Sequence, residues 1–200
     1  MTKIIISTLY DKEPTLVATT KLGADQLYIV VDDPVNETQQ NSLAIIRETL
    51  DRVVKIYTIE AHPYDIVGTA RKIVALLENF SEEDHVTVNI TSGRKTQSLG
   101  LLYGAYARAR YVDRIIYVSE EEHRIIDLPK LSFNLTESQL QLLEQIEKKS
   151  HLSLSDLAEK SGMSRSMLYR NLQNLEDHGF IIVDKESRYL LTDAGKIARL

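Results

Sequence analysis

Residues 88–96, Val-Asn-Ile-Thr-Ser-Gly-Arg-Lys-Thr, decide the fold of the larger part of this 200-residue chain. A strand-like apolar segment ends here, three small residues form a turn, and a helical pattern begins with two cations. The first turn of a helix has unpaired N–H groups and a partial positive charge, so Arg94 and Lys95 lie where the helix dipole disfavours cations. We therefore predict a strand–turn–helix unit whose helix start binds an anion, such as a phosphate.

Strand-like and helix-like segments alternate on both sides of this unit. Strands are predicted at residues 3–8, 26–31, 53–59, 86–90, 114–118 and 123–128, and helices at residues 14–22, 37–52, 65–80 and 94–110. The helix at 65–80 has an apolar stripe of Ile66, Ile73, Val74 and Leu77. Strands joined by helical crossovers form a mostly parallel sheet with helices on both faces. The predicted fold class is a doubly wound, Rossmann-like α/β domain.

The composition excludes several classes of chemistry. The chain has no cysteine, which excludes disulfides, thiolate catalysis and cysteine-ligated zinc. Its five histidines show no metal-ligand spacing, so we predict no metal site. No apolar run approaches the roughly 20 residues that cross a bilayer, and the N-terminus lacks a signal-peptide pattern. We expect a cytoplasmic protein with no membrane partner and no cofactor.

The pattern changes after residues 129–132, Pro-Lys-Leu-Ser, because three helical segments and a single hairpin then follow one another. We predict a ligand-sensing domain at 1–131 and a small α+β domain at 132–200. Residues 1–132 hold 15 basic and 19 acidic side chains, and residues 133–200 hold 9 and 10. A net charge of −1 on the second part is a mild argument against DNA binding, unless its cations gather on one face.

The first helix of the second domain has a clear start. Thr136 followed by Gln139 is a capping-box pattern, in which the side chain of each residue accepts a hydrogen bond from the backbone N–H group of the other. Leu140, Leu143 and Ile146 share one helical face and are predicted to face the core.

The rest of this domain has the pattern of a winged helix-turn-helix. Ala158 and Gly162 precede a helix that Ser164 caps and that carries Leu168. The small alanine lets two helices approach, and the glycine makes the bend between them. Two strand-like runs at 180–183 and 188–191 then form the wing. This pattern resembles winged-helix regulators of the multiple-antibiotic-resistance and arsenical-repressor kind, which implies binding to double-stranded DNA.

Outward residues of the third helix and of the wing are the candidates for contact with bases and phosphates. They are Ser164, Arg165, Ser166, Tyr169, Arg170, Gln173, Lys185 and Arg188. The alternative is an ordinary solvated face on a winged helix that contacts only proteins. The acidic residues nearby, Glu176, Asp177, Asp184 and Glu186, keep that alternative open.

A second turn is predicted to lie beside the first. The first strand ends in Ser7 and Thr8, and Leu9 and Tyr10 follow it. Ligands of parallel α/β sheets bind outside the carboxyl ends of strands, where the strand order reverses. We therefore expect both turns at one edge of the sheet, with Tyr10 either stacked on a base or covering the sheet edge.

The turn at 91–95 offers several binding groups at once. Gly93 lets the backbone approach a ligand, and Thr91 and Ser92 offer hydroxyl groups. The pattern is neither a Rossmann G-x-G-x-x-G nor a Walker A loop, so generic NAD or ATP binding is not predicted. The alternative is a plain N-capped helix with solvated basic residues.

These features together resemble the CRISPR-associated Rossmann-fold family, and most closely its archaeal regulators of the Csa-three type. The resemblance rests on the turn after the first strand, on Asn89-x-Thr91-Ser92-Gly93-Arg94-Lys95, and on the domain order. It implies a homodimer that binds cyclic oligoadenylate, commonly cyclic tetra-adenylate, across its twofold axis and regulates CRISPR arrays or associated genes. The ligand-site residues that it implies are Thr8, Leu9, Tyr10, Thr91, Ser92, Gly93, Arg94 and Lys95.

Two other functions are compatible with the same turns. Some relatives cleave the cyclic ligand, and Thr8 and Lys95 are placed to position a ribose hydroxyl and stabilise the leaving oxygen. Neither turn contains a histidine as general base, so any cleavage is expected to be slow, and we predict no catalytic residue. The other function is a regulator whose effector is an unrelated small molecule.

Overall fold

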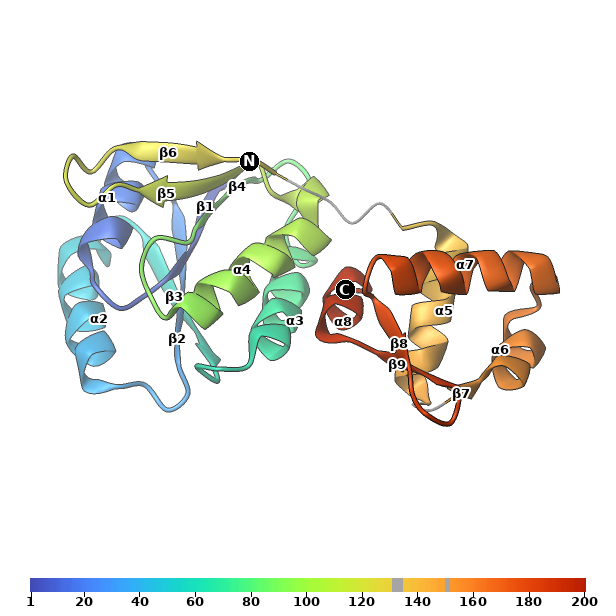
Figure 1. Ribbon diagram of the computed structural model, residues 1–200. Coiled ribbons are helices and arrows are strands. Elements are labelled where there is room, and N and C mark those ends of the chain that lie inside the picture. The colour runs from blue at the N-terminus through green and yellow to red at the C-terminus, as the bar shows by residue number, and fades with distance from the viewer. Residues whose placement is uncertain (131–134, 150–151) are drawn as a thin grey trace. The chain divides into compact units, whose positions relative to one another are not determined.

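The computed structural model describes residues 1–130, 135–149 and 152–200. The chain forms two compact units, residues 1–132 and 133–200, which are described separately below (Figure 1). The boundary predicted between residues 131 and 132 lies outside the described residues. Within the described ranges, every helix is too short or too polar to span a membrane.

A six-stranded sheet forms the centre of the N-terminal unit, with strand order β3-β2-β1-β4-β5-β6. Strands β1 to β5 are parallel and β6 is antiparallel to β5. The strands are β1 (Lys3–Thr8), β2 (Gln26–Asp32), β3 (Lys55–Ala61), β4 (His85–Asn89), β5 (Arg114–Val118) and β6 (Ile125–Leu128). The helices are α1 (Glu13–Leu22), α2 (Glu37–Leu50), α3 (Ile66–Leu77) and α4 (Lys95–Ala107), with a 3-10 turn, η1 (Ala109–Tyr111). The predicted doubly wound, mostly parallel sheet is confirmed.

Each face of the sheet buries its own apolar core. Helices α1 and α2 cover one face, and α3 and α4 cover the other (Figure 1). Ile73, Val74 and Leu77 of the predicted stripe on α3 are buried, whereas Ile66 is only partly buried. Gly100 and Gly104 let α4 lie close to α3, because a Cβ there would meet Thr69 and Ile73 at 2.6 and 2.8 Å. This close packing holds α4 against α3.

Several segments differ from their predicted bounds by one to three residues. The third strand begins at Lys55 and not at Val53, because the N–H groups of Val53 and Val54 both donate to the Leu50 carbonyl and continue the turn from α2. The helix predicted at 94–110 ends at Ala107. The 3-10 turn that follows it extends to Tyr111.

The C-terminal unit has the predicted winged-helix architecture. Its helices are α5 (Glu137–Lys148), α6 (Leu154–Ser161), α7 (Arg165–Asp177) and α8 (Asp193–Ala198). Its three-stranded sheet has the order β7-β9-β8, from β7 (Leu152–Ser153), β8 (Ile181–Val183) and β9 (Arg188–Leu191). The capping box of Thr136 and Gln139 is present, and Gly162 ends α6 with a φ of 64°. A helix-turn-helix with a β8–β9 wing is therefore confirmed.

One core residue of α5 was predicted wrongly. Leu140 is 37% exposed, and Leu142 is fully buried beside Leu143 and Ile146. The buried face follows positions 139, 142, 143 and 146, which is the spacing of one helical stripe, and Leu140 lies just outside it.

Candidate functional site

The turns after β1 and β4 lie side by side, as predicted. β1 and β4 are parallel neighbours, with Ser7 paired to Asn89, so both strands end at one edge of the sheet. The Ser92 hydroxyl accepts hydrogen bonds from the N–H groups of Tyr10 and Asp11, both at 2.9 Å, and donates to the Asp11 carbonyl at 3.0 Å. This serine therefore holds the two turns together at the point where the strand order reverses.

Gly93 occupies a backbone conformation that favours glycine. Its φ is 91°, and a Cβ at this position would lie 2.7 Å from Thr8 Cβ and 3.2 Å from the Leu9 nitrogen. Cβ atoms do not approach other atoms so closely, and the left-handed region is strained for other residues. The glycine is what allows the second turn to lie directly against the first.

The hydroxyl groups of the two turns are used inside the protein. The Thr8 hydroxyl donates to the Ser92 carbonyl and lies 3.2 Å from the Ser98 hydroxyl. The Thr91 hydroxyl donates to Asn89 Oδ1 at 2.5 Å and accepts the Val118 N–H at 2.8 Å. Sequence reasoning predicted that Thr91 and Ser92 offer these groups to a ligand, and in the structure they fix the shape of the turns.

Leu9 requires a similar correction. Its side chain is fully buried in the core under α1 and α2. Its N–H donates to the Val30 carbonyl, and its carbonyl accepts from Gln39 Nε2 at 2.7 Å. Leu9 thus anchors the first turn to the core. The sequence did not predict this burial, because the side chain of a residue in a turn can point toward the core or toward solvent.

The start of α4 has free backbone donors beside a free cation. Arg94 is the N-cap residue and makes no capping hydrogen bond through its side chain. Helices α2, α3 and α5 to α8 begin with an N-cap side chain that accepts an early N–H group, whereas the N-cap residue of α1, like that of α4, does not. Lys95 is exposed and forms no ion pair with a described residue. The first turn of α4 therefore presents N–H groups, the helix dipole and an ammonium group to an anion.

Arg94 is paired inside the protein, whereas its predicted contact with a ligand stays a prediction. Its Nε lies 2.9 Å from Asp32 Oδ2 at the end of β2, and its side chain remains 36% exposed. The Asp32 carboxylate is almost fully buried. Hydrogen bonding to Asp32 and its charge raise the pKa of Arg94 above the ordinary arginine value.

Sequence reasoning did not predict Asp32 or the hydrogen bonds that hold its carboxylate. Asn36 Nδ2 donates to Asp32 Oδ2 at 2.7 Å, and Gln39 Nε2 lies 3.4 Å from Oδ1. Gln39 is fully buried, and its Oε1 also accepts the Asp32 N–H at 2.9 Å. The signal that was available is the position of Asp32 at the carboxyl end of a parallel strand, next to β1.

Replacing Asp32 with alanine is expected to lower the free energy of unfolding by about 1–3 kcal/mol, because buried donors lose their acceptor. Urea denaturation followed by circular dichroism measures this. Asp33→Ala is the matched control, since Asp33 is exposed and its loss is expected to cost less than about 0.5 kcal/mol. Equal stabilities of the two variants would contradict a structural role for the Asp32 carboxylate.

Two exposed tyrosines lie at this edge of the sheet. Tyr10 is 48% exposed and Tyr64, in the turn between β3 and α3, is 69% exposed. The Arg94 guanidinium lies 5.7 Å from the centre of the Tyr64 ring. Tyr10 was predicted at this edge and Tyr64 was not, although its turn also follows the carboxyl end of a parallel strand.

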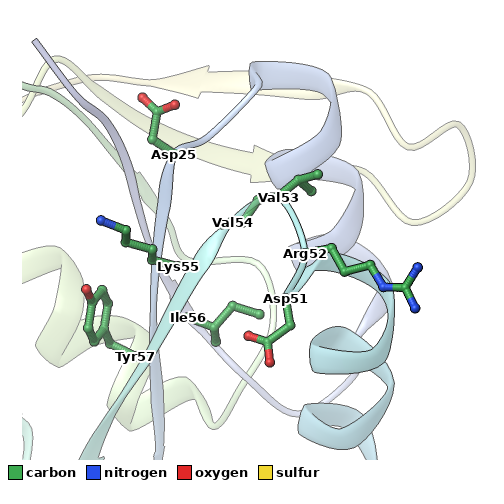
Figure 2. A pocket seen from close by; sticks show the side chains of 8 residues that line it. All are labelled: Asp25, Asp51, Arg52, Val53, Val54, Lys55, Ile56 and Tyr57. Atoms are coloured by element: carbon green, nitrogen blue, oxygen red, sulfur yellow. The ribbon is translucent and has the colours of Figure 1, made fainter.

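A groove of the unit lies at the other end of the sheet. It has a volume of about 610 Å³ and is bordered by the amino ends of β2 and β3 and the turn that precedes β3 (Figure 2). Its charged residues are Asp25, Asp51, Arg52 and Lys55. It contains none of the predicted ligand residues, because those lie at the carboxyl ends of the strands.

No metal centre accompanies either site among the residues that the structure describes. Within those ranges, no group of three or more histidine, aspartate or glutamate side chains could hold a metal ion. The groups at the carboxyl edge that suit an anion are the backbone amides at the start of α4 and Lys95.

The C-terminal unit places all of its predicted DNA-contacting residues on the surface. Every one of the eight, from Ser164 to Arg188, is exposed. Ser164 also caps α7 by accepting the Met167 N–H at 3.4 Å. The helix α7 turns Leu168, Leu172 and Leu175 inward, so its cations Arg165 and Arg170 lie outside this buried stripe.

The candidates differ in how their side chains are already engaged. Arg188 pairs with Glu186 at 2.7 Å, and Gln173 donates to Asp177 at 2.9 Å. Arg165, Arg170 and Lys185 form no ion pair with the described residues. These three cations are therefore available for phosphate or base contact without breaking an internal pair.

Comparison with known proteins identifies both parts of the chain. Residues 4–123 match the family described as HFX_2341_N-like, N-terminal. The chain belongs to this family. Residues 135–182 match the winged helix-turn-helix DNA-binding family. The HFX_2341_N-like match thus contains β1 to β5 and α1 to α4, and the second match contains α5 to α7 and the start of the wing.

Solved structures share the fold at low sequence identity. Can2 from Sulfobacillus thermosulfidooxidans, solved in complex with cyclic tetra-adenylate, is 15% identical, with a TM-score of 0.52 over 98% of this chain and 62% of its own. Enterococcus italicus Csm6, bound to cyclic hexa-2′-fluoro-hexa-dAMP, is 13% identical, with a TM-score of 0.54 over 89% and 55%. Protein VC1899 from Vibrio cholerae is 11% identical, with a TM-score of 0.52 over 98% and 63%.

This HFX_2341_N-like chain spans about 55 to 63% of the length of those three structures. No curated protein matches it in sequence. The matches confirm the predicted Rossmann-like fold followed by a winged helix-turn-helix. The archaeal Csa-three type and the role of each site residue stay predictions.

Proposed function

We propose that this protein is a ligand-responsive transcriptional regulator. Its N-terminal domain binds a cyclic oligoadenylate and its winged helix binds double-stranded DNA. The observation that carries this proposal is the start of α4, where uncapped N–H groups and the free Lys95 lie beside the β1 turn at the reversal of strand order. The DNA-binding domain in the same chain is the part whose affinity for DNA the bound ligand would change.

A cyclic oligoadenylate suits this edge because it is a compact ring of phosphates. Lys95 and the dipole of α4 supply the positive field, while Asp32 already neutralises Arg94. In two proteins of the same fold, Can2 and Csm6, the bound molecule is a cyclic oligonucleotide. We take cyclic tetra-adenylate as the ligand, because its twofold symmetry fits a homodimer that duplicates each turn around one axis.

A dimer also explains how the ligand acts on DNA. Two recognition helices α7 about one helical turn of DNA apart fit a palindromic site. The ligand changes DNA affinity only through a different affinity for two dimer arrangements, and the spacing of the winged helices is the quantity that differs. The proposed targets are CRISPR arrays or their associated genes.

Lys95→Ala is expected to weaken binding of cyclic tetra-adenylate by about 10- to 100-fold, since a charge-assisted hydrogen bond contributes about 1.5–3 kcal/mol. Isothermal titration calorimetry of the full chain measures this. Lys55→Ala is the matched control, because Lys55 is an exposed lysine in the groove at the opposite end of the sheet (Figure 2). A wild-type protein that binds common metabolites and no cyclic oligoadenylate would support an unrelated effector.

Regulation is favoured over ligand cleavage by the position of Thr8. Its side chain is fully buried and its hydroxyl donates to the Ser92 carbonyl, so it does not face a bound ribose. Neither turn contains a histidine. Linear products that form from cyclic tetra-adenylate with wild-type protein, and not with Lys95→Ala, would establish slow ring-nuclease activity in addition.

A further inference from the structure

The turn between β3 and α3 displays an aromatic ring to solvent in a fixed position. Tyr64 is 69% exposed, although burying a ring of this size is favourable. Its neighbour His62 lies 6.3 Å away, edge to face. An exposed ring that is held in place at the carboxyl edge of a parallel sheet suits contact with a ligand.

Several hydrogen bonds fix this turn against the candidate site. The Thr96 hydroxyl, on the first turn of α4, donates to the Pro63 carbonyl. The Asp65 N–H donates to the His62 carbonyl at 3.2 Å, and Asp65 Oδ1 accepts the Gly68 N–H at 2.8 Å to start α3. The turn is therefore attached to the same helix start that presents the anion-binding amides.

Arg94 links this turn to the end of β2. The buried Asp32 holds the guanidinium, which lies 5.7 Å from the centre of the Tyr64 ring. Tyr10 lies against the turn that precedes Arg94, because its N–H donates to the Ser92 hydroxyl at 2.9 Å. An exposed tyrosine from each of two turns thus lies at the edge of the sheet where α4 begins with Arg94 and Lys95.

We infer that Tyr64, together with Tyr10 and the face of Arg94, forms a nucleobase-stacking subsite beside the phosphate-binding start of α4. The inference rests on the proposed function and adds the side chains that contact the base of the ligand. Aromatic and guanidinium planes stack on bases exposed outside a helix, whereas phosphates need the amides and the ammonium group. The edge of the sheet contains both kinds of group, which is what a nucleotide ligand requires.

The test uses the full-length protein and a cyclic tetra-adenylate in which one adenine is replaced by 2-aminopurine. Stacking quenches 2-aminopurine fluorescence, and the chain has no tryptophan to interfere with its excitation. Wild-type protein and Tyr64→Phe are expected to quench the probe and to bind within about twofold of each other, because the ring is kept. Tyr64→Ala is expected to bind about 10- to 100-fold more weakly and to lose most of the quenching.

Tyr57→Ala is the matched control, since Tyr57 is an exposed tyrosine that belongs to the same region of the chain and borders the groove in Figure 2. It is expected to bind and quench as the wild type does, with circular dichroism confirming that each variant is folded. If wild-type protein binds and quenches the probe and Tyr64→Ala does so equally well, the stacking subsite is overturned and the proposed function stands. If wild-type protein does not bind the probe or unmodified cyclic tetra-adenylate, the proposed function itself fails.

Discussion

Gly93→Ala is expected to reduce the affinity for cyclic tetra-adenylate by more than about 100-fold and to destabilise the N-terminal unit by about 2–4 kcal/mol. The added Cβ would lie 2.7 Å from Thr8 Cβ, at a φ of 91° that alanine rarely adopts. The turn before α4 must then move away from the β1 turn, and the N–H groups at the start of α4 move with it. Calorimetry with the ligand and urea denaturation measure the two effects.

Gly23→Ala is the control that distinguishes the effect of the close contact at Gly93 from the effect of backbone strain. Gly23 also has a positive φ, 67°, but the nearest atom to an added Cβ is Lys3 Nζ at 4.0 Å. This control is expected to lose about 1–2 kcal/mol of stability and to keep its ligand affinity. Wild-type affinity in Gly93→Ala would show that the close approach of the two turns is irrelevant to binding, and the proposed site would have to be abandoned.

Replacing both Arg165 and Arg170 with alanine is expected to weaken DNA binding by about 100-fold or more, because each lost contact with a base or phosphate costs about 1–3 kcal/mol. Both side chains are exposed on α7 and neither is paired with a described acidic residue. The slope of log affinity against log salt is also expected to fall by about 2, since two cations no longer displace counterions. Gel shifts across a salt series, with DNA from the upstream region of the gene, measure both quantities.

Lys196→Ala provides the control for this experiment. Lys196 lies on α8, outside the recognition helix and the wing, and its ammonium group is paired with Asp193 at 2.8 Å. Its loss is expected to leave both the affinity and the salt slope close to the wild-type values. If the double arginine variant binds DNA as tightly as the wild type, or if binding does not depend on salt, the winged helix would instead be assigned to contacts with proteins.

The two cations at the carboxyl edge of the sheet, Arg94 and Lys95, have different roles in the structure. Two neighbouring cations in the sequence have different partners, because Arg94 is bound to the buried Asp32 and Lys95 is free. Only Lys95 can neutralise a phosphate without breaking an internal pair. Arg94 instead offers a fixed planar face, which is why the two residues enter separate predictions.

The winged helix was predictable almost entirely from local patterns. The capping box at Thr136, the left-handed Gly162 and the N-cap Ser164 each depend on residues within one turn of chain. The α/β unit was predictable for the same reason, because period and turn residues define its strands and helices. Leu140 shows the limit of such reasoning, since a residue at the border of a helical stripe is assigned by what packs against it.

The sequence by itself determined the order of elements, the two domains and the meeting of the turns after β1 and β4, because parallel strands place their carboxyl ends at one edge. Only the tertiary structure decided which groups in those turns are free. Thr8, Leu9 and Ser92 are used to build the site, and Asp32 engages Arg94 from 62 positions away. Such partners come from strands and helices far apart in the chain, and local periodicity contains no information about them.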